Sequence, residues 1–599
     1  AIDNALLGDQ SLLPDELGKD NPGHNVFFML PLLMGLLGLF WQAAAGKRGI
    51  EQFWVVFFLF FMTGIAIVLY LNQIPGQPRE RDYAFAGSFY AYAIWVGMGV
   101  AAIWRIVCRL SANIKKGEPK PELTDGNADG KYSLAGAVIA AVIGILVPLQ
   151  VVSQTWDDHD RSGRYTARDF GMNYLNSLDK NAIIFTYGDN DTFPLWYAQE
   201  VEGVRTDVKV ANLSYLTTDW YIDQLRRQSY DAPGIDVLAK SSDYAYDARQ
   251  AFFFPEKAST EFVDATKALK AAYGNDDNKF PYPFVTIAAN GEAAVKAGRI
   301  KAGEEVSDIQ LALPYSNRNG VTINSVMVID VLNSSARNGW NRPIYFATTV
   351  PTENYIGLDP YFSQTGLAYE VVPVYHEDAA GVNTEKMYRN ITELWRWGGL
   401  DKVKKKGDIY LDETVRRMLT SNRGAIFDLT RCLGIEAYNA KTDPARFIYG
   451  NAADSLDIEL TAEEKSRADS FVNDRVDKML TLLKLQKEKL PEAAMDYTFI
   501  EYDQLCEAYS LLHEITGDDK YLRQCLSLLE TELDRFGKFM GYYDSLPAPL
   551  YNALSDRDLM IISYYPMLIR QYYQYSGDME ATKKLLDSLE KKYKFKLDI

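Results

Sequence analysis

Hydrophobic residues are distributed differently before and after about residue 157 of this 599-residue chain. Four stretches in the first part carry no charged residue and are long enough to cross a bilayer, which takes about 20 apolar residues. A helix buried in a large soluble core is the alternative, but such a helix normally keeps a polar face, and these stretches have none. The pattern predicts four membrane-spanning helices, at about residues 26–45, 53–71, 83–104 and 132–156.

Basic residues predict how this membrane region is oriented. Lys47 and Arg48 follow the first predicted span, and a second basic loop, residues 105–120, follows the third. Loops rich in lysine and arginine stay in the cytoplasm. The chain after residue 156 is therefore expected on the opposite side of the membrane.

The predicted outer loop before the third span carries charges of both signs, at Arg79, Glu80, Arg81 and Asp82. The planar guanidinium group of arginine binds phosphate with two parallel hydrogen bonds. A lipid-linked phosphate at the bilayer surface would be within reach, so these residues are a candidate donor-phosphate site. The alternative is a helix start capped by Asp82, with the arginines paired to Glu80 and to lipid headgroups.

Residues 157–400 show the pattern of an α/β domain. The run AIIFTY at 182–187 predicts a buried strand, and a second strand is predicted at 208–216, each followed by residues with helical spacing. This order predicts a parallel strand pair with a right-handed crossover. Further strands are predicted at residues 325–332 and 342–350.

Asp189, Asn190 and Asp191 directly follow the first of these strands. Ligands of open α/β sheets bind at the carboxyl ends of the strands. Two carboxylates one residue apart can hold a divalent cation, which in turn can hold a diphosphate. The alternative is a polar turn in which Asp191 or Thr192 caps a helix beginning at Pro194.

Residues 401–599 contain only helical patterns. Two helix pairs are predicted, joined at Gly517-Asp518 and at Gly577-Asp578. Glycine suits the end of one helix and aspartate the start of the next. The plan resembles tetratricopeptide-type repeats, which bind partner proteins or support a neighbouring domain.

Composition narrows the function classes. The formal net charge of −17 argues against nucleic-acid binding, which needs a basic surface. Four cysteines without a Cys-x-x-Cys pair and four dispersed histidines predict neither a disulfide scaffold nor a metal cluster. Cys506 and Cys525 fall on predicted helices and are expected to pack in the core.

Several motifs together resemble one bacterial membrane family. They are QPRERDYAF at 77–85 and the segments at 186–208, 216–225 and 340–350. In combination they look like the domain-of-unknown-function 2723 family, which is similar to the transmembrane protein O-mannosyltransferases, glycosyltransferases of the GT-C type.

The resemblance implies transfer of a mannose-like sugar from a polyprenyl-phosphate donor to an exported protein. It also implies the bacterial inner membrane, with the large C-terminal part in the periplasm. GT-C enzymes keep a catalytic acidic residue in their first external loop, and no such loop precedes residue 26. The chain is therefore expected to be the C-terminal part of a longer protein, and no catalytic residue is assigned to it.

Two other functions fit the residues. The first is a non-enzymatic envelope scaffold that is anchored in the bilayer and binds exported proteins through its helical repeats. The second is a metal-dependent enzyme acting on sugar nucleotides, centred on Asp189 and Asp191, although such substrates are scarce outside the cytoplasm.

Overall fold

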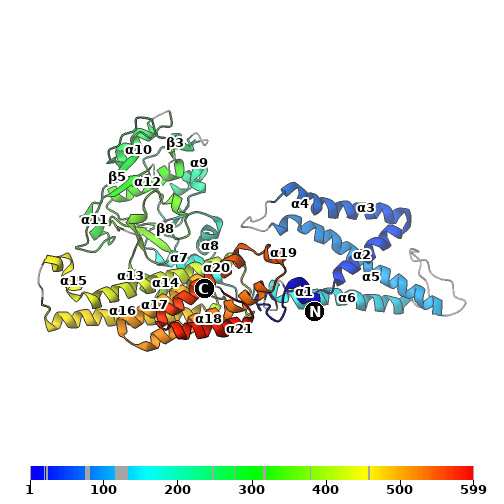
Figure 1. The fold of residues 1–599 in the computed structure, drawn as a ribbon. Coiled ribbons are helices and arrows are strands. Elements are labelled where there is room, and N and C mark those ends of the chain that lie inside the picture. Colours follow the sequence, from blue (N-terminus) through cyan, green and yellow to red (C-terminus); the bar gives the residue numbers. More distant parts are fainter. Residues whose placement is uncertain are drawn as a thin grey trace. The chain divides into compact units, whose positions relative to one another are not determined.

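The structure, a computed structural model, describes residues 2–18, 21, 24–73, 81–114, 133–245, 249–274, 277–313, 319–377, 380–455 and 459–597 (Figure 1). The chain divides into two compact units. We call Asp15–Asp160 the membrane unit, and Ala1–Pro14 together with Arg161–Ile599 the large unit.

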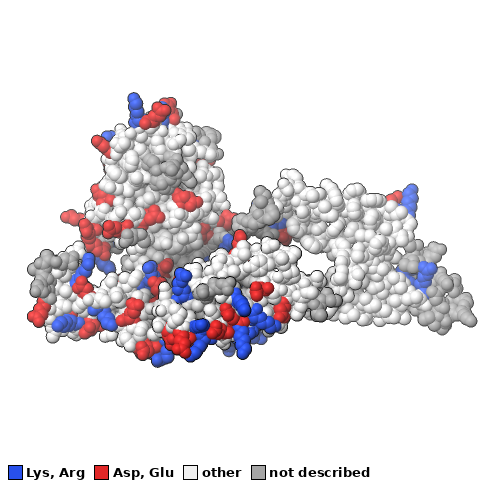
Figure 2. All heavy atoms as spheres, viewed as in Figure 1, with Lys and Arg blue, Asp and Glu red and all other residues white. Residues whose placement is uncertain are grey.

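The membrane unit consists of apolar helices. Figure 2 shows almost no charged side chains on their visible surface, whereas charges crowd the C-terminal helices of the large unit. Within the residues that the structure describes, three stretches are long and apolar enough to cross a bilayer, so the chain is a membrane-anchored protein. They are Gly46–Leu71, Asp82–Leu110 and Leu134–His159. The helices are α2 (Leu30–Ala44), α3 (Gly46–Thr63), α4 (Ile65–Leu71), α5 (Ala86–Ile114) and α6 (Ser133–His159), with the 3-10 turn η1 (Asp82–Phe85) before α5.

Helix α2 is shorter than the span predicted at 26–45. Phe28 and Met29 have φ values of 49° and 56°, in the left-handed region, so the helix begins only at Leu30. Its 15 residues measure about 22 Å at 1.5 Å each, less than the roughly 30 Å of a bilayer core. Small residues let α2 approach α5 closely, since a Cβ added to Gly38 would lie 1.9 Å from the carbonyl oxygen of Trp95.

A six-stranded mixed sheet forms the centre of the α/β part, in the order β11-β9-β10-β8-β1-β2. Strands β8, β1 and β2 run parallel, with Ile183 of β1 opposite Lys209 of β2 and Ile344 of β8. The predicted parallel pair is thus confirmed. The strands are β1 (Ile183–Thr186), β2 (Lys209–Asn212), β8 (Ile344–Ala347), β9 (Phe362–Gln364), β10 (Ala368–Val371) and β11 (Gly381–Val382).

Helices and two smaller sheets surround this sheet. β3 (Ala251–Phe253) pairs with β7 (Gly320–Thr322), and a second sheet has the order β4-β5-β6. Its strands are β4 (Val263–Asp264), β5 (Phe284–Ile287) and β6 (Ile309–Ala312). The helices of this part are α7 (Thr166–Ser177), α8 (Asp189–Glu200), α9 (Asp219–Leu225), α10 (Ala265–Tyr273), α11 (Gly291–Lys296), α12 (Ile323–Arg337) and α13 (Thr384–Arg389).

The strand predicted at residues 325–332 is wrong, because these residues belong to α12. The helix is buried along nearly its whole length, so its sequence has no polar stripe that would distinguish it from a buried strand. Its one charged core residue, Asp330, accepts hydrogen bonds from Leu238 N, Ala239 N and the Tyr273 hydroxyl. Strand β8 confirms the prediction at 342–350.

The C-terminal part is helical from Glu413 onward, as predicted. Gly517 and Gly577 end their helices with φ values of 72° and 62°, and Asp518 and Asp578 cap the next helices. Cys506 and Cys525 are fully buried, as expected. The helices are α14 (Glu413–Thr442), α15 (Pro444–Tyr449), α16 (Ala462–Lys489), α17 (Phe499–Thr516), α18 (Asp519–Asp544), α19 (Ala548–Tyr551), α20 (Asp556–Ser576) and α21 (Met579–Tyr593).

The first residues of the chain belong to the large unit, which the sequence did not predict. Helix α1 (Ile2–Leu7) leads to Asp9, whose amide donates to Ser545 Oγ at 2.8 Å and whose carboxylate pairs with Lys594 Nζ at 2.9 Å. The hydrogen bond from Lys594 lowers the pKa of Asp9 to about 2. Leu12 is buried in the core formed by the C-terminal helices.

Candidate functional site

A pocket of about 240 Å³ lies where β1 ends and α8 begins, within the large unit. Three segments supply most of its wall: residues 187–191, Thr349 just after β8, and the first turns of α14. The pocket is thus at the carboxyl edge of the parallel strands, where the strand order predicts a ligand site.

The three residues of the predicted ligand edge have different roles in this pocket. Asp191 is buried, and its carboxylate accepts hydrogen bonds from Tyr187 N at 3.2 Å, Gly188 N at 3.1 Å and Thr349 Oγ1 at 2.8 Å. Asp189 and Asn190 are exposed and line the pocket. Of the three predicted residues, Asp189 and Asn190 are therefore the ones that present their side chains to a ligand.

Asp191 acts as part of the cap of α8. The helix begins at Asp189, five residues before the predicted start at Pro194, and Gly188 is its N-cap residue. Burial raises the pKa of Asp191, although its hydrogen bonds with Thr349 and Tyr187 oppose that effect. In the described part of the chain, no group of three or more histidine, cysteine, aspartate or glutamate residues is placed to hold a metal ion.

Buried polar groups support the floor of this edge. Thr186, the last residue of β1, bonds Thr192 through their hydroxyls at 2.7 Å, and Asn212 Nδ2 donates to Thr192 Oγ1 at 2.9 Å. The Asn212 side chain also accepts from Ser214 N at 2.8 Å. These contacts hold the ends of β1 and β2 at a fixed distance. The polar residues that end the two strands, Thr186 and Asn212, were the feature of the sequence that indicated these contacts.

Helix α14 closes the pocket from the other side. Thr414, Arg417 and Ser421 line it and share one helix face, because residues three and four apart are neighbours on a helix. The Arg417 side chain is 58% exposed and pairs with Glu413. The sequence did not predict these residues as part of the site, because more than 200 positions separate them from Asp189. Their helical spacing indicated only that they share one face of a helix.

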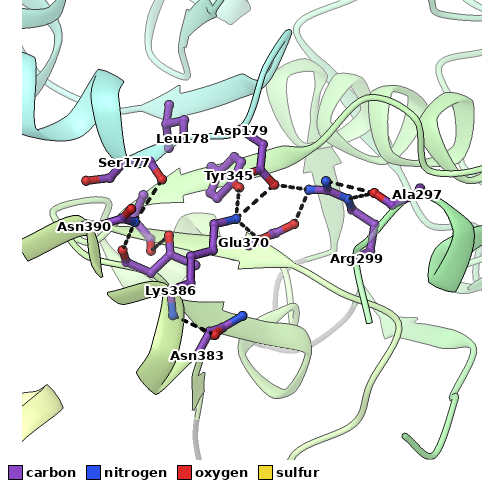
Figure 3. Close-up of polar contacts among 12 residues, drawn as sticks. Ser177, Leu178, Asp179, Ala297, Arg299, Tyr345, Glu370, Asn383, Lys386 and Asn390 are labelled. Atoms are coloured by element: carbon purple, nitrogen blue, oxygen red, sulfur yellow. Dashed lines mark hydrogen bonds and ion pairs between the residues drawn. The ribbon is translucent and has the colours of Figure 1, made fainter. Parts of the chain in front are cut away.

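A buried ion cluster lies at the opposite, amino edge of the parallel strands (Figure 3). Arg299 and Lys386 both bind Asp179 and Glu370, and Lys386 Nζ also donates to the Tyr345 hydroxyl at 2.9 Å. Two cations and two anions balance, and each contacts both opposite charges. We therefore assign the cluster a structural role.

The charged loop before the third predicted span is described only in part. Arg79 and Glu80 lie outside the described residues. Arg81 and Asp82 are exposed; Arg81 precedes η1, and Asp82 is its first residue. The donor-phosphate site stays a prediction.

A comparison with known families reaches the α/β part, which contains the sheet and the strand side of the pocket. Residues 167–389 match the family model TMEM260-associated domain 2. The matched segment begins in α7 and ends with α13, so it includes Asp189, Asn190 and Thr349. No curated protein and no solved structure matches the chain.

Proposed function

We propose that this chain is the membrane-anchored C-terminal part of a GT-C-type glycosyltransferase, which transfers a mannose-like sugar from polyprenyl phosphate to an exported protein. The motif resemblance supports this proposal, as do the membrane-length helices and the match to a domain associated with a transmembrane protein. The observation that carries it is the pocket at the carboxyl edge of β1 and β8, which combines polar side chains with apolar surface.

The pocket suits a ligand with many hydroxyl groups. Asp189 and Asn190 offer hydrogen-bond acceptors, while Arg417 and the Thr414 hydroxyl offer donors. The Ser421 hydroxyl donates to the Arg417 carbonyl at 3.2 Å, so its oxygen is left as an acceptor. Phe170, Tyr187 and Met418 add apolar surface for the face of a sugar ring. The volume of about 240 Å³ is below the usual range for drug-sized ligands, so it fits one sugar ring or a short acceptor side chain.

The proposed topology has four crossings. Ala1–Pro14 and Arg161–Ile599 belong to one compact unit, so both must lie on the same side of the membrane. The number of crossings between them is then even, and three membrane-length helices alone would give an odd number. Crossing by the short helix α2 makes the number even and agrees with the predicted extracytoplasmic position of the large unit.

Labelling tests this topology in intact cells. In our proposal a membrane-impermeant maleimide reagent labels Ser11→Cys from outside and labels Arg48→Cys only after the cells are opened, because the two exposed residues lie on opposite sides. The unmodified protein supplies the background from the native cysteines. Labelling of both variants from the same side would contradict four crossings.

Reconstitution tests the activity. The protein is placed in liposomes with polyprenyl-phosphate mannose and an acceptor protein. We expect Asp189→Ala/Asn190→Ala and Arg79→Ala/Arg81→Ala to abolish most of the transfer. Glu292→Gln, a surface change in α11, serves as the control with unchanged transfer. Full activity in the pocket variant would refute the role of the pocket.

A scaffold function is the second candidate, favoured by the long, mutually packed helices α14, α16, α17, α18, α20 and α21. In that case the full chain in nanodiscs retrieves exported proteins and transfers no sugar to them. The dependence of sugar transfer on divalent cations is measured in the transfer assay. Binding of Mn²⁺ to the full chain is measured separately by calorimetry. Binding that is lost in the Asp189→Ala variant would favour metal-dependent chemistry over both candidates.

A further inference from the structure

We propose that the large unit rests on the lipid–water interface through a band of aromatic side chains, of which Trp196 and Tyr215 are half-buried and the others exposed. This aromatic band consists of Tyr165, Phe193, Trp196, Tyr197, Tyr215 and Trp220, carried by α7's N-cap position, α8, α9 and the turn before α9. The partner is the bilayer surface itself. The proposal does not depend on sugar transfer.

The aromatic rings form one continuous surface. Phe193 stacks on Trp196 with centroids 5.6 Å apart, Trp196 stacks on Tyr215 at 6.2 Å, and Tyr215 lies 6.3 Å from Trp220. Phe193 and Tyr197 are four residues apart on α8 and therefore share a face. This surface is open: Trp220 is 57% exposed, Phe193 46% and Tyr197 43%.

Ion pairing joins Tyr165 to the same surface. The Tyr197 hydroxyl donates to Glu202 at 3.2 Å, and Arg168 Nε donates to Glu202 at 2.8 Å. The Arg168 guanidinium lies 5.7 Å from the ring centre of Tyr165, which is itself 55% exposed. The band thus reaches from Trp220 back to the start of α7.

Covalent geometry keeps this start close to the membrane. Helix α6, which is long and apolar enough to cross the bilayer, ends at His159, and Trp156 in its last turn is 67% exposed. Five residues lie between His159 and Tyr165, so the six steps from one to the other span at most about 22 Å at up to 3.6 Å each. Tryptophan and tyrosine are enriched where a bilayer meets water, because their rings are apolar and their N–H and O–H groups remain hydrated.

Nearby arginines have partners inside the large unit, so they do not supply the attraction to lipid. Arg164 pairs with Asp412 at 2.5 Å, and Arg168 pairs with Glu202. The guanidinium of Arg161 lies 5.0 Å from the ring centre of Tyr410. We therefore expect contact with zwitterionic lipid, without a requirement for anionic headgroups.

Tryptophan quenching in nanodiscs tests the proposal with the full chain. Phe193→Trp adds a probe in the band, and Phe262→Trp adds a matched probe beside β4, since the two phenylalanines are 46% and 45% exposed. The added emission is the difference from the unmodified protein. In phosphatidylcholine carrying bromine near the headgroup, we expect most of the added emission of Phe193→Trp to be lost and that of Phe262→Trp to be retained.

Three outcomes would overturn the proposal. The first is equal quenching of the two probes. The second is quenching of the Phe193→Trp probe only when anionic lipid is present, because the contact would then be electrostatic. The third is an unquenched probe whose emission shifts on adding a soluble mannose oligosaccharide, which would make the band a carbohydrate platform.

Discussion

Removing one cation from the buried ion cluster of Figure 3 should destabilise the α/β part strongly. Lys386→Met keeps most of the aliphatic side chain and deletes the charge. Lys386 Nζ donates to Asp179, Glu370 and the Tyr345 hydroxyl, each at 2.9 Å. After the change, two carboxylates share Arg299 as the remaining cation of this cluster.

The magnitude follows from how deeply the cluster is buried. The Glu370 side chain is 5% exposed, Arg299 10% and Lys386 14%, so water cannot replace the lost ammonium group. Deleting one partner of a buried ion pair costs about 3–5 kcal/mol. We use about 3 kcal/mol, because Asp179 is 30% exposed and regains some hydration. At about 2–4 °C per kcal/mol for a domain of this size, the melting temperature should fall by about 6–12 °C.

A double-mutant cycle measures the coupling. The full chain in detergent is unfolded by heat and followed by near-ultraviolet circular dichroism, for Lys386→Met, Glu370→Gln and both changes together. The double variant restores charge balance between Arg299 and Asp179, so it should lose at least about 1 kcal/mol less than the sum of the single variants. A melting temperature unchanged in Lys386→Met, or strictly additive losses, would refute this account of the cluster.

The stability that the protein loses in the Lys386→Met variant should also depend on pH. Burial alone would raise the pKa of Asp179, but the charges and hydrogen bonds of Lys386 and Arg299 outweigh it and lower the pKa. A carboxylate with a lowered folded-state pKa stabilises the fold above its unfolded pKa of about 3.9, and this stability is lost as the pH falls through the folded value. The difference between the native protein and Lys386→Met should therefore be fully present at pH 6 and shrink below about pH 4.

Two further predictions concern the C-terminal helices. Arg423→Met should destabilise them by about 3–5 kcal/mol, because it leaves the buried carboxylate of Glu501 without its cation and removes the hydrogen bond from Arg423 Nη2 to the Met495 carbonyl at 2.6 Å. The expected result is faster amide hydrogen exchange in α14 and α17, and unchanged exchange would contradict the prediction. Gly541→Ala should loosen α21 from α18 by about 1–3 kcal/mol, because the new Cβ would lie 2.0 Å from the Tyr593 carbonyl oxygen. Gly424→Ala in α14 is the control, because a Cβ added at this position has no other atom within 4 Å, and this change should be neutral or slightly stabilising. Equal melting temperatures for the two alanine variants would refute the packing argument.

Local patterns predicted much of the fold. The charge-free stretches identified the membrane region, because no soluble helix needs continuous apolarity. Apolar runs with helical segments between them predicted the parallel pair β1–β2. The Gly-Asp turns at 517–518 and 577–578 were readable because helix caps depend on neighbouring residues alone.

Predictions were weaker where one pattern allows two structures. The apolar run at 325–332 is compatible with a buried helix and with a buried strand, and only the packing of the folded chain shows that it belongs to α12. Asp191 follows β1 as a metal ligand would, yet its carboxylate caps α8 and accepts from Thr349. Asp189 and Asn190 line the pocket, and their role at a ligand edge stays a prediction; the pocket residues on α14 were not predicted.

The sequence by itself determined where the long apolar helices lie, that β1 and β2 run parallel and where the helix pairs turn at 517–518 and 577–578, since each depends on residues close together in the chain. Only the tertiary structure decided that Arg417 faces Asp189 across the pocket, that Lys386 joins Asp179, and that Asp9 meets Lys594. These contacts join residues some 200 to 600 positions apart. No local pattern records such a pairing, because it arises only when packed elements bring distant side chains to one place.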